Sequence, residues 1–132
     1  MTGDLSHWGP VLESDFFKEL ERRTRDRGPG LCLTGLVEGA RSLVLALLVA
    51  RTGRGCMLVA PDDAAIEGYR RDLSACAGLL GRDPRRVATF PALDADPYDG
   101  IAAHPEVVRE RVLALAALLA GDVDFLLSLI HI

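Results

Sequence analysis

Short apolar runs alternate along this chain with longer segments of helical periodicity, and glycine or proline separates most of them. Four of the runs have the length and character of buried parallel strands. They are residues 31–34, 56–60, 87–90 and 123–127. The segments of helical periodicity are residues 14–27, 40–52, 63–80 and 105–120. This alternation predicts βαβ units, and hence a three-layer α/β domain with a mostly parallel sheet of about four strands and flanking helices.

Residues at the helix ends support these assignments. Ser14 and Asp62 occupy expected N-cap positions, and Pro105 lies in the first turn of the last helix. The segment 40–52 is too apolar for a surface helix, so we expect it to lie against the sheet.

The first helix has an amphipathic pattern. We expect Phe16, Phe17 and Leu20 to form its buried stripe. The charged residues Glu19, Arg22 and Arg23 should face outward.

Composition restricts the class of protein. The chain has 132 residues, of which 49% are hydrophobic and 26% charged, as in one globular domain. A net charge of −4 gives no basic field to attract nucleic acid. The three scattered cysteines predict buried free thiols in a reducing cytoplasm. No apolar run approaches the ~18–20 residues of a membrane span, and no signal pattern opens the chain. We therefore expect a cytoplasmic protein without membrane contact.

The first predicted strand leads into Gly35-Leu36-Val37-Glu38-Gly39-Ala40-Arg41-Ser42. This is where a phosphate-binding loop with the pattern G-x-x-x-x-G-K-[ST] would lie. Gly35 and Ser42 match the pattern, but Ala40 replaces the second glycine and Arg41 replaces the lysine.

Each change opposes phosphate binding. A Cβ at Ala40 crowds the phosphate and penalises left-handed backbone by about 1–2 kcal/mol. The planar guanidinium of Arg41 cannot replace a compact ammonium, and Glu38 repels an anion. We interpret residues 35–42 as a degenerate phosphate loop that keeps its shape without its ligand. The alternatives are a chance match at a helix start and a site that still binds nucleotide.

A second motor motif is also missing from the sequence. No Asp-Glu pair follows a predicted strand, and Asp122 and Asp124 stand at the start of theirs. A magnesium-binding carboxylate belongs at the end of a strand. We find no catalytic triad, paired carboxylates or metal cluster with suitable spacing.

A later segment has a more specific pattern. Phe90-Pro91 ends the third predicted strand, Pro97-Tyr98-Asp99 follows in a proline-restrained loop, and His104-Pro105 opens a helix with Arg111 and Leu115 as R-x-x-x-L. With residues 35–42 and Val59-Ala60-Pro61-Asp62, this pattern resembles the N-terminal module of the bacterial transcription-repair coupling factor (Mfd). The resemblance covers residues 14–128. Ala102-Ala103-His104 stands where that family has serine-proline-histidine.

The resemblance implies a P-loop-NTPase-like fold, similar to the first domain of the excision-repair subunit UvrB. UvrB keeps an intact phosphate loop and a long aromatic β-hairpin after the third strand. Here only about fourteen residues, with Tyr98 as the one aromatic, separate that strand from the next helix. Both differences favour the coupling factor.

By this resemblance, the parent protein is an ATP-dependent DNA translocase that displaces stalled RNA polymerase and recruits UvrA for nucleotide excision repair. Its ATP- and magnesium-dependent motor and its DNA and polymerase contacts lie in other domains. We therefore expect this part to be a non-hydrolysing structural or regulatory module without a cofactor, which packs on the remainder of its parent chain. The rival interpretations are an active ATPase that uses Arg41, a UvrB-like damage-recognition domain and a free-standing flavodoxin-like binding domain.

Single residues of the signature allow two interpretations each. Tyr98 and Asp99 lie where α/β proteins bind ligands, but packing of the loop and capping of a turn are simpler roles. His104 is a catalytic candidate, although a place at a helix N-terminus is the better interpretation. Arg109 and Arg111 either contact a partner domain or, as we prefer, form a solvated helix face.

The ends of the chain complete the predicted organisation. Residues 1–13 form a leader whose His7 and Trp8 either dock on the domain or stay free. The domain spans residues 14–128, and the apolar residues 129–132 are expected to be a non-native tail of a protein that continues. The alternative is a genuine extension of the last strand. A module separated from its parent should expose a sheet edge and an apolar helix surface.

Overall fold

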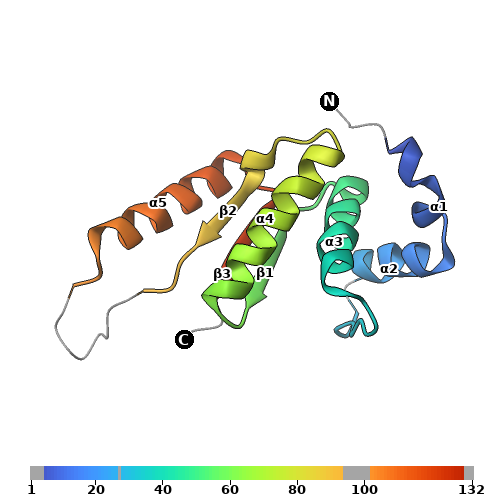
Figure 1. Ribbon diagram of the computed structural model, residues 1–132, viewed down its shortest axis with the longest axis horizontal. Helices are drawn as coiled ribbons and strands as arrows, with labels where there is room; N and C mark the ends of the chain where they lie inside the picture. The colour runs from blue at the N-terminus through green and yellow to red at the C-terminus, as the bar shows by residue number, and fades with distance from the viewer. Residues whose placement is uncertain (1–4, 27, 94–101, 130–132) are drawn as a thin grey trace.

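The computed structural model describes residues 5–26, 28–93 and 102–129 (Figure 1). Three strands form a parallel sheet in the order β1-β3-β2. They are β1 (Cys56–Ala60), β2 (Val87–Phe90) and β3 (Phe125–Leu129). The helices are α1 (Gly9–Leu12), α2 (Asp15–Arg25), α3 (Glu38–Thr52), α4 (Asp63–Leu79) and α5 (Pro105–Ala120), with short 3-10 turns at Ser6–Trp8 and Pro84–Arg86. The prediction of a mixed α/β fold with a parallel sheet is confirmed.

Local signals place several elements within a residue of their predicted ends. The side chain of Ser14 accepts a hydrogen bond from the Phe17 amide and caps α2. Asp62 does the same for the Ala65 amide at the start of α4. Such caps satisfy donors that a helix start leaves unpaired, each worth about 1 kcal/mol. β1, β2 and α5 have their predicted bounds.

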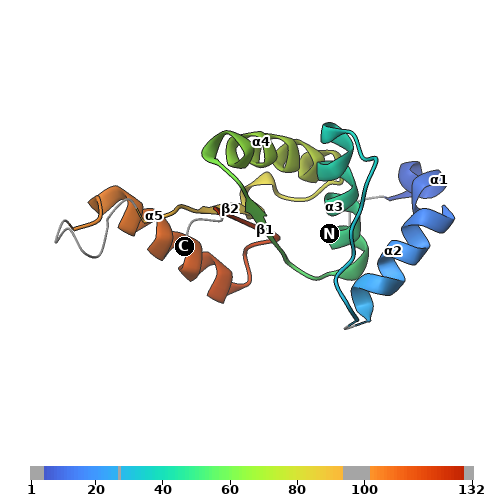
Figure 2. The same ribbon diagram turned by 90° about the horizontal axis from the view of Figure 1, so that it is seen from below.

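The strand register gives the sheet two different faces. Leu58 and Thr89 both lie opposite the buried Leu127, so these three side chains share one face. Helix α4 lies along this face and contributes the buried Ile66 to the same core (Figure 2). This is the main hydrophobic core of the chain.

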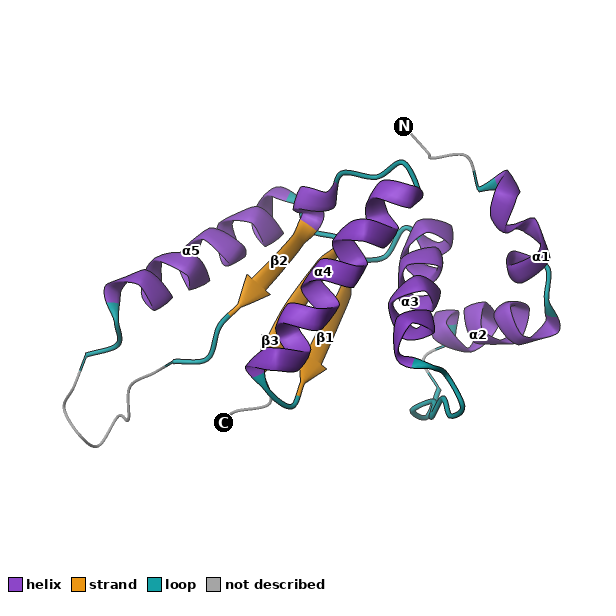
Figure 3. Ribbon diagram, in the orientation of Figure 1, coloured by secondary structure: helices purple, strands orange, loops and turns teal. Residues whose placement is uncertain are grey.

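The opposite face is left open over β1. Met57 and Val59 alternate with the buried positions of β1, and 61% and 50% of their surfaces are exposed. Helix α5 lies beyond β2 and contacts that strand (Figures 2 and 3). Parallel sheets are normally covered on both faces. An apolar surface over β1 is therefore exposed, as predicted, while its cause stays a prediction.

The segment 31–34 is not a strand, which corrects the prediction of four strands. Leu31 and Leu33 are about two-fifths exposed, and no described strand pairs with them. The central strand β3 already has β1 on one side and β2 on the other. An apolar run becomes a strand only where the backbone of a neighbouring strand can pair with its own backbone groups. Residues 31–34 pair with neither edge strand, β1 or β2, of the described sheet.

Helix α3 begins at Glu38, two residues before its predicted start, and it lies beside α4 instead of against the sheet. Apolar side chains of α3 nevertheless belong to the hydrophobic core. Leu47 is fully buried, in one cluster with Phe17 of α2. Phe16 is 47% exposed, so it does not belong to the predicted buried stripe of α2. A second helical layer thus takes the place predicted for the sheet.

Strand β3 begins two residues later than predicted and ends at Leu129, beyond the predicted domain limit. The delay is caused by Asp124, whose buried carboxylate accepts hydrogen bonds from Arg82 and Arg86, both at 2.9 Å. Asp122 and Asp124 precede the strand, as expected. Residues 130–132 of the predicted tail lie outside the described residues.

The leader, as far as it is described, docks on the domain. Leu12 belongs to the buried core, and Leu5 and Trp8 pack against it. This decides between the two alternatives left open for Trp8.

The prediction of buried thiols is wrong for Cys32, which is exposed, while Cys56 and Cys76 are half-buried. The misplaced strand at 31–34 explains the error. Burial raises the pKa of the Cys56 thiol, and burial followed by the Asp72 charge raises the pKa of Cys76.

We predict that Cys32 in the folded protein reacts with a disulfide reagent at least about tenfold faster than Cys56, because Cys32 is exposed and burial disfavours the Cys56 thiolate. Timed labelling followed by peptide mass spectrometry measures both rates. Cys32→Ser should remove the fast phase. If Cys32 instead stays unreactive until the protein unfolds, residues 31–34 are buried, as a strand there would require.

Candidate functional site

The expected phosphate loop is mostly helix. Gly35 has the left-handed backbone (φ +79°) that favours glycine, but residues from Glu38 onward belong to α3. The amides of Ala40 and Arg41 both donate to the Val37 carbonyl, at 3.0 and 3.3 Å. A phosphate cradle needs such amides free for the ligand. Gly39 and Ala40 therefore build a helical turn.

The two polar residues of this segment point to different environments. Ser42 is fully buried, and its hydroxyl has no hydrogen-bond partner in the described part of the chain. It is therefore not presented to a metal or phosphate at the surface. Arg41 is exposed. The residue types of a phosphate loop are present, but their side chains do not converge.

Arg41 and Tyr69 border two small hollows between α3 and α4. The hollows measure about 280 and 160 Å³, below the usual 300–1,000 Å³ of a small-molecule site. Glu38 and Asp72 line the smaller one together with Arg41, so two carboxylates share this hollow with the guanidinium. Neither the volume nor the charge suits a nucleoside triphosphate.

The signature residues that the structure describes form one contact. The Arg111 guanidinium lies over the Phe90 ring, 3.9 Å from its centroid, and donates to the Pro91 carbonyl at 2.5 Å. This contact joins α5 to the end of β2 over twenty residues of sequence. Arg111 is half-buried, so the predicted solvated face is wrong for it, whereas Arg109 is exposed. Pro97, Tyr98 and Asp99 lie outside the described residues.

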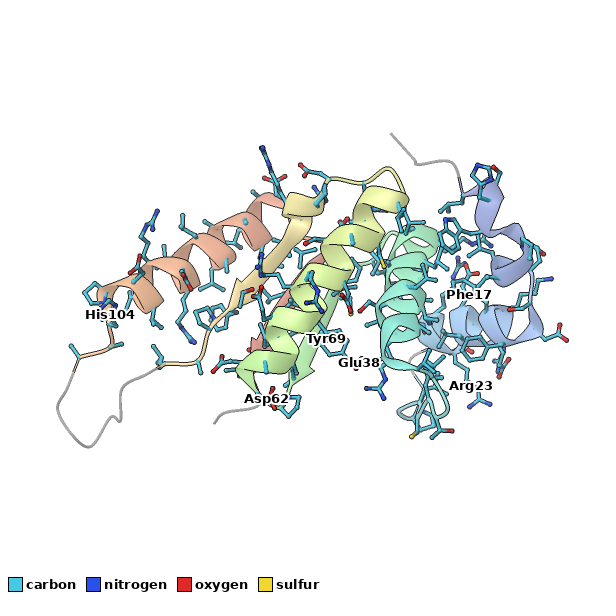
Figure 4. All side chains as sticks on the ribbon, viewed as in Figure 1. Phe17, Arg23, Glu38, Asp62, Tyr69 and His104 are labelled. Carbon is cyan, nitrogen blue, oxygen red and sulfur yellow. The ribbon has the colours of Figure 1, made fainter. Side chains whose placement is uncertain are left out.

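His104 is at the N-terminus of α5, where its Nδ1 accepts from the Glu106 amide at 3.3 Å (Figure 4). The preferred interpretation of His104 as a helix-end residue is confirmed. An N-cap acceptor at this position satisfies a backbone donor of the first turn.

The arginines of α2 do not form a free basic surface. Hydrogen bonds from Arg22 and then Arg23 lower the pKa of Glu19 to about 2, so this carboxylate stays ionised and neutralises its neighbours. Arg25 pairs with Glu21 in the same way. Phosphate-backbone recognition depends on unpaired cations, so α2 offers little to a nucleic acid.

A groove between α4 and α5 was not predicted from the sequence. Its volume is about 700 Å³, and its walls meet over β2. It is lined by Asp63, Ile66, Glu67 and Arg70 of α4, by Ala88, Thr89 and Pro91, and by Glu110, Leu113, Ala114 and Ala117 of α5. The signal available in the sequence was the run of small residues on α5, which lets the helix approach the sheet without filling the space.

No family model, curated protein or solved structure matches this chain. Among the described residues, no group of His, Cys, Asp and Glu is arranged to hold a metal ion. No described helix has both the length and the apolar character needed to cross a membrane.

Arg111→Ala should lower the free energy of unfolding by about 1–2 kcal/mol, because it removes both the ring contact and the bond to the Pro91 carbonyl. Arg109→Ala, on the exposed side of the same helix, is the matched control and should change stability by less than about 0.5 kcal/mol. Urea denaturation measures both. Equal effects would show that the contact contributes no stability.

Proposed function

We propose that this chain is a structural docking domain, the degenerate UvrB-like first domain of a transcription-repair coupling factor. It works by packing on other domains of its parent chain. It neither binds nor hydrolyses nucleotide. The parent's translocation on DNA, its displacement of RNA polymerase and its recruitment of UvrA belong to other domains in this proposal.

The uncovered apolar surface is the observation that carries the proposal. Val108, Val112, Leu115 and Leu119 follow one stripe of α5 at alternating spacings of four and three, and all are exposed. Leu119 reaches 89% exposure. The body of the domain is contacted by the opposite side of α5, where Ala114 is buried.

Met57 and Val59, on the open face of β1, are further exposed apolar residues. Exposed apolar residues that gather along one helix stripe and one strand face usually mark an interface. Burying them gives about 25 cal/mol for each Å² of apolar area, which favours a packed neighbour over exposure to water. Another domain of the parent chain that packs on these side chains is therefore the simplest partner for this surface.

The geometry of residues 35–42 supports the non-hydrolysing half of the proposal. The amides of Ala40 and Arg41 are used within α3, and Ser42 is buried. The P-loop-like origin belongs to the proposal and rests on the sequence pattern of this segment and of the Phe90–Arg111 signature.

Calorimetric titration with Mg-ATP should give no saturable heat up to millimolar nucleotide, for the wild-type chain and for Arg41→Ala alike. The reason is that the Ala40 and Arg41 amides are used within α3 and that the Glu38 carboxylate stands in its first turn, where it repels phosphate. Micromolar binding that Arg41→Ala abolishes would contradict the proposal and support the rival ATPase.

The double variant Val112→Glu/Leu119→Glu should bind less of a hydrophobic dye and associate less with itself, at unchanged thermal stability, because both side chains are exposed. Ala64→Glu/Ala75→Glu is the matched control, since it adds two carboxylates at exposed positions of α4. Dye fluorescence and sedimentation provide the two readouts. If the control lowers both readouts as much, net charge is responsible and the α5 stripe is not an interface.

A further inference from the structure

The groove between α4 and α5 combines an apolar floor with an acidic rim. Ile66 of α4 and Leu113 of α5 supply apolar walls, and Ala114 and Ala117 keep the α5 side shallow. A volume of about 700 Å³ holds several large aliphatic side chains. The space therefore suits apolar side chains that enter from another segment.

The charges on the rim are not balanced within the groove. Asp63 stands on the α4 wall and Glu110 on the α5 wall, both exposed and without a charged partner among the described residues. Arg70 is occupied by Glu67, which accepts two of its hydrogen bonds at 2.9 and 2.6 Å. Two carboxylates that form no ion pair among the described residues thus line the groove from its two helices.

We propose that this groove binds an amphipathic helix whose apolar face is flanked by Lys or Arg. The apolar side chains would enter between α4 and α5, and the cations would reach Asp63 and Glu110. Binding of an amphipathic helix in an apolar groove is a general recognition mode, in which anchors recur at three- and four-residue spacing. Complementary charge on the rim selects the partner and its orientation.

A second copy of this chain fits the groove poorly. The chain carries a net charge of −4, so two copies repel each other. The arginines of α2 are neutralised by Glu19 and Glu21 on the same helix. The apolar stripe of α5 is flanked by Glu106 as well as by Arg109. The inference goes beyond the proposed function, because it concerns a different surface and does not depend on what covers the outer stripe of α5.

The test uses the full chain and a labelled peptide of about four helical turns, made of leucine and lysine with leucine on one face. Fluorescence anisotropy should show saturable binding that weakens as salt is raised. A glutamate-for-lysine peptide and a scrambled leucine-lysine peptide should each bind at least about tenfold more weakly. Absence of binding, or equal binding of the scrambled peptide, would overturn the proposal.

Two leucines of α5 provide a matched pair of variants. Leu113 lines the groove and is 54% exposed, whereas Leu119 is more exposed and lies outside it. Leu113→Arg should weaken the lysine peptide at least about tenfold, and Leu119→Arg less than about twofold, although both add the same charge. Circular dichroism checks that both variants remain folded.

Asp63→Asn/Glu110→Gln should weaken binding and flatten its salt dependence, since the double variant keeps the shape of the groove and removes its charge. An equal loss in Leu119→Arg and Leu113→Arg would place the peptide on the outer stripe of α5 and reject the groove. The calorimetric result with Mg-ATP is unaffected by either outcome, so failure of the two proposals can be told apart.

Discussion

The three strands of this protein meet at one residue, Asp124. Its backbone amide donates to the Arg86 carbonyl at 2.7 Å, and its carbonyl accepts from the Cys56 amide at 2.8 Å. Its buried carboxylate binds Arg82 and Arg86. Loss of one arginine would leave part of the charge of the buried Asp124 carboxylate without compensation, which destabilises the fold. Asp124 thus fixes the start of β3 against the approaches to both neighbouring strands.

The position of β3 determines the surfaces of the molecule. With β3 central and β1 at an edge, the register directs Leu58 and Leu127 toward α4 and Met57 toward the opposite face. One helix, α4, covers the first face, while α5 is held at β2 by Arg111 over Phe90. The molecule therefore has a complete core on one side of its sheet and an incomplete one on the other. This asymmetry accounts for the exposure of Met57 and Val59 on β1.

Local patterns predicted what local interactions determine. The caps Ser14 and Asp62 mark helix starts because a single side chain satisfies a nearby amide. Residues 31–34 carry the same apolar signal as a strand, but pairing depends on a partner elsewhere in the chain. That partner cannot be read from the run itself. Likewise, the apolar content of α3 indicated burial correctly and did not specify whether a sheet or another helix provides it.

Prediction of the candidate site was limited in the same way, because a sequence pattern gives residue types and does not give their tertiary contacts. The segment 35–42 matched a loop pattern by residue type, yet the pattern does not reveal that the amides of Ala40 and Arg41 bond to the Val37 carbonyl in a helical turn. Arg82 and Arg86 are 42 and 38 residues from Asp124, so no periodicity links them to it. The groove between α4 and α5 is likewise a product of the tertiary arrangement of Leu113 and Ile66.

The contact between α5 and the end of β2 is independent of residues 35–42 for a physical reason. Phe90, Pro91 and Arg111 have a structural role that requires no ligand, since they attach α5 to the end of β2. The same contact holds α5 with its apolar stripe exposed, and nothing in that arrangement involves residues 35–42. Under the proposed docking function, these three residues are constrained even where residues 35–42 bind nothing. Under the same proposal, residues 35–42 have no ligand to hold, so they are free to form the first turn of α3.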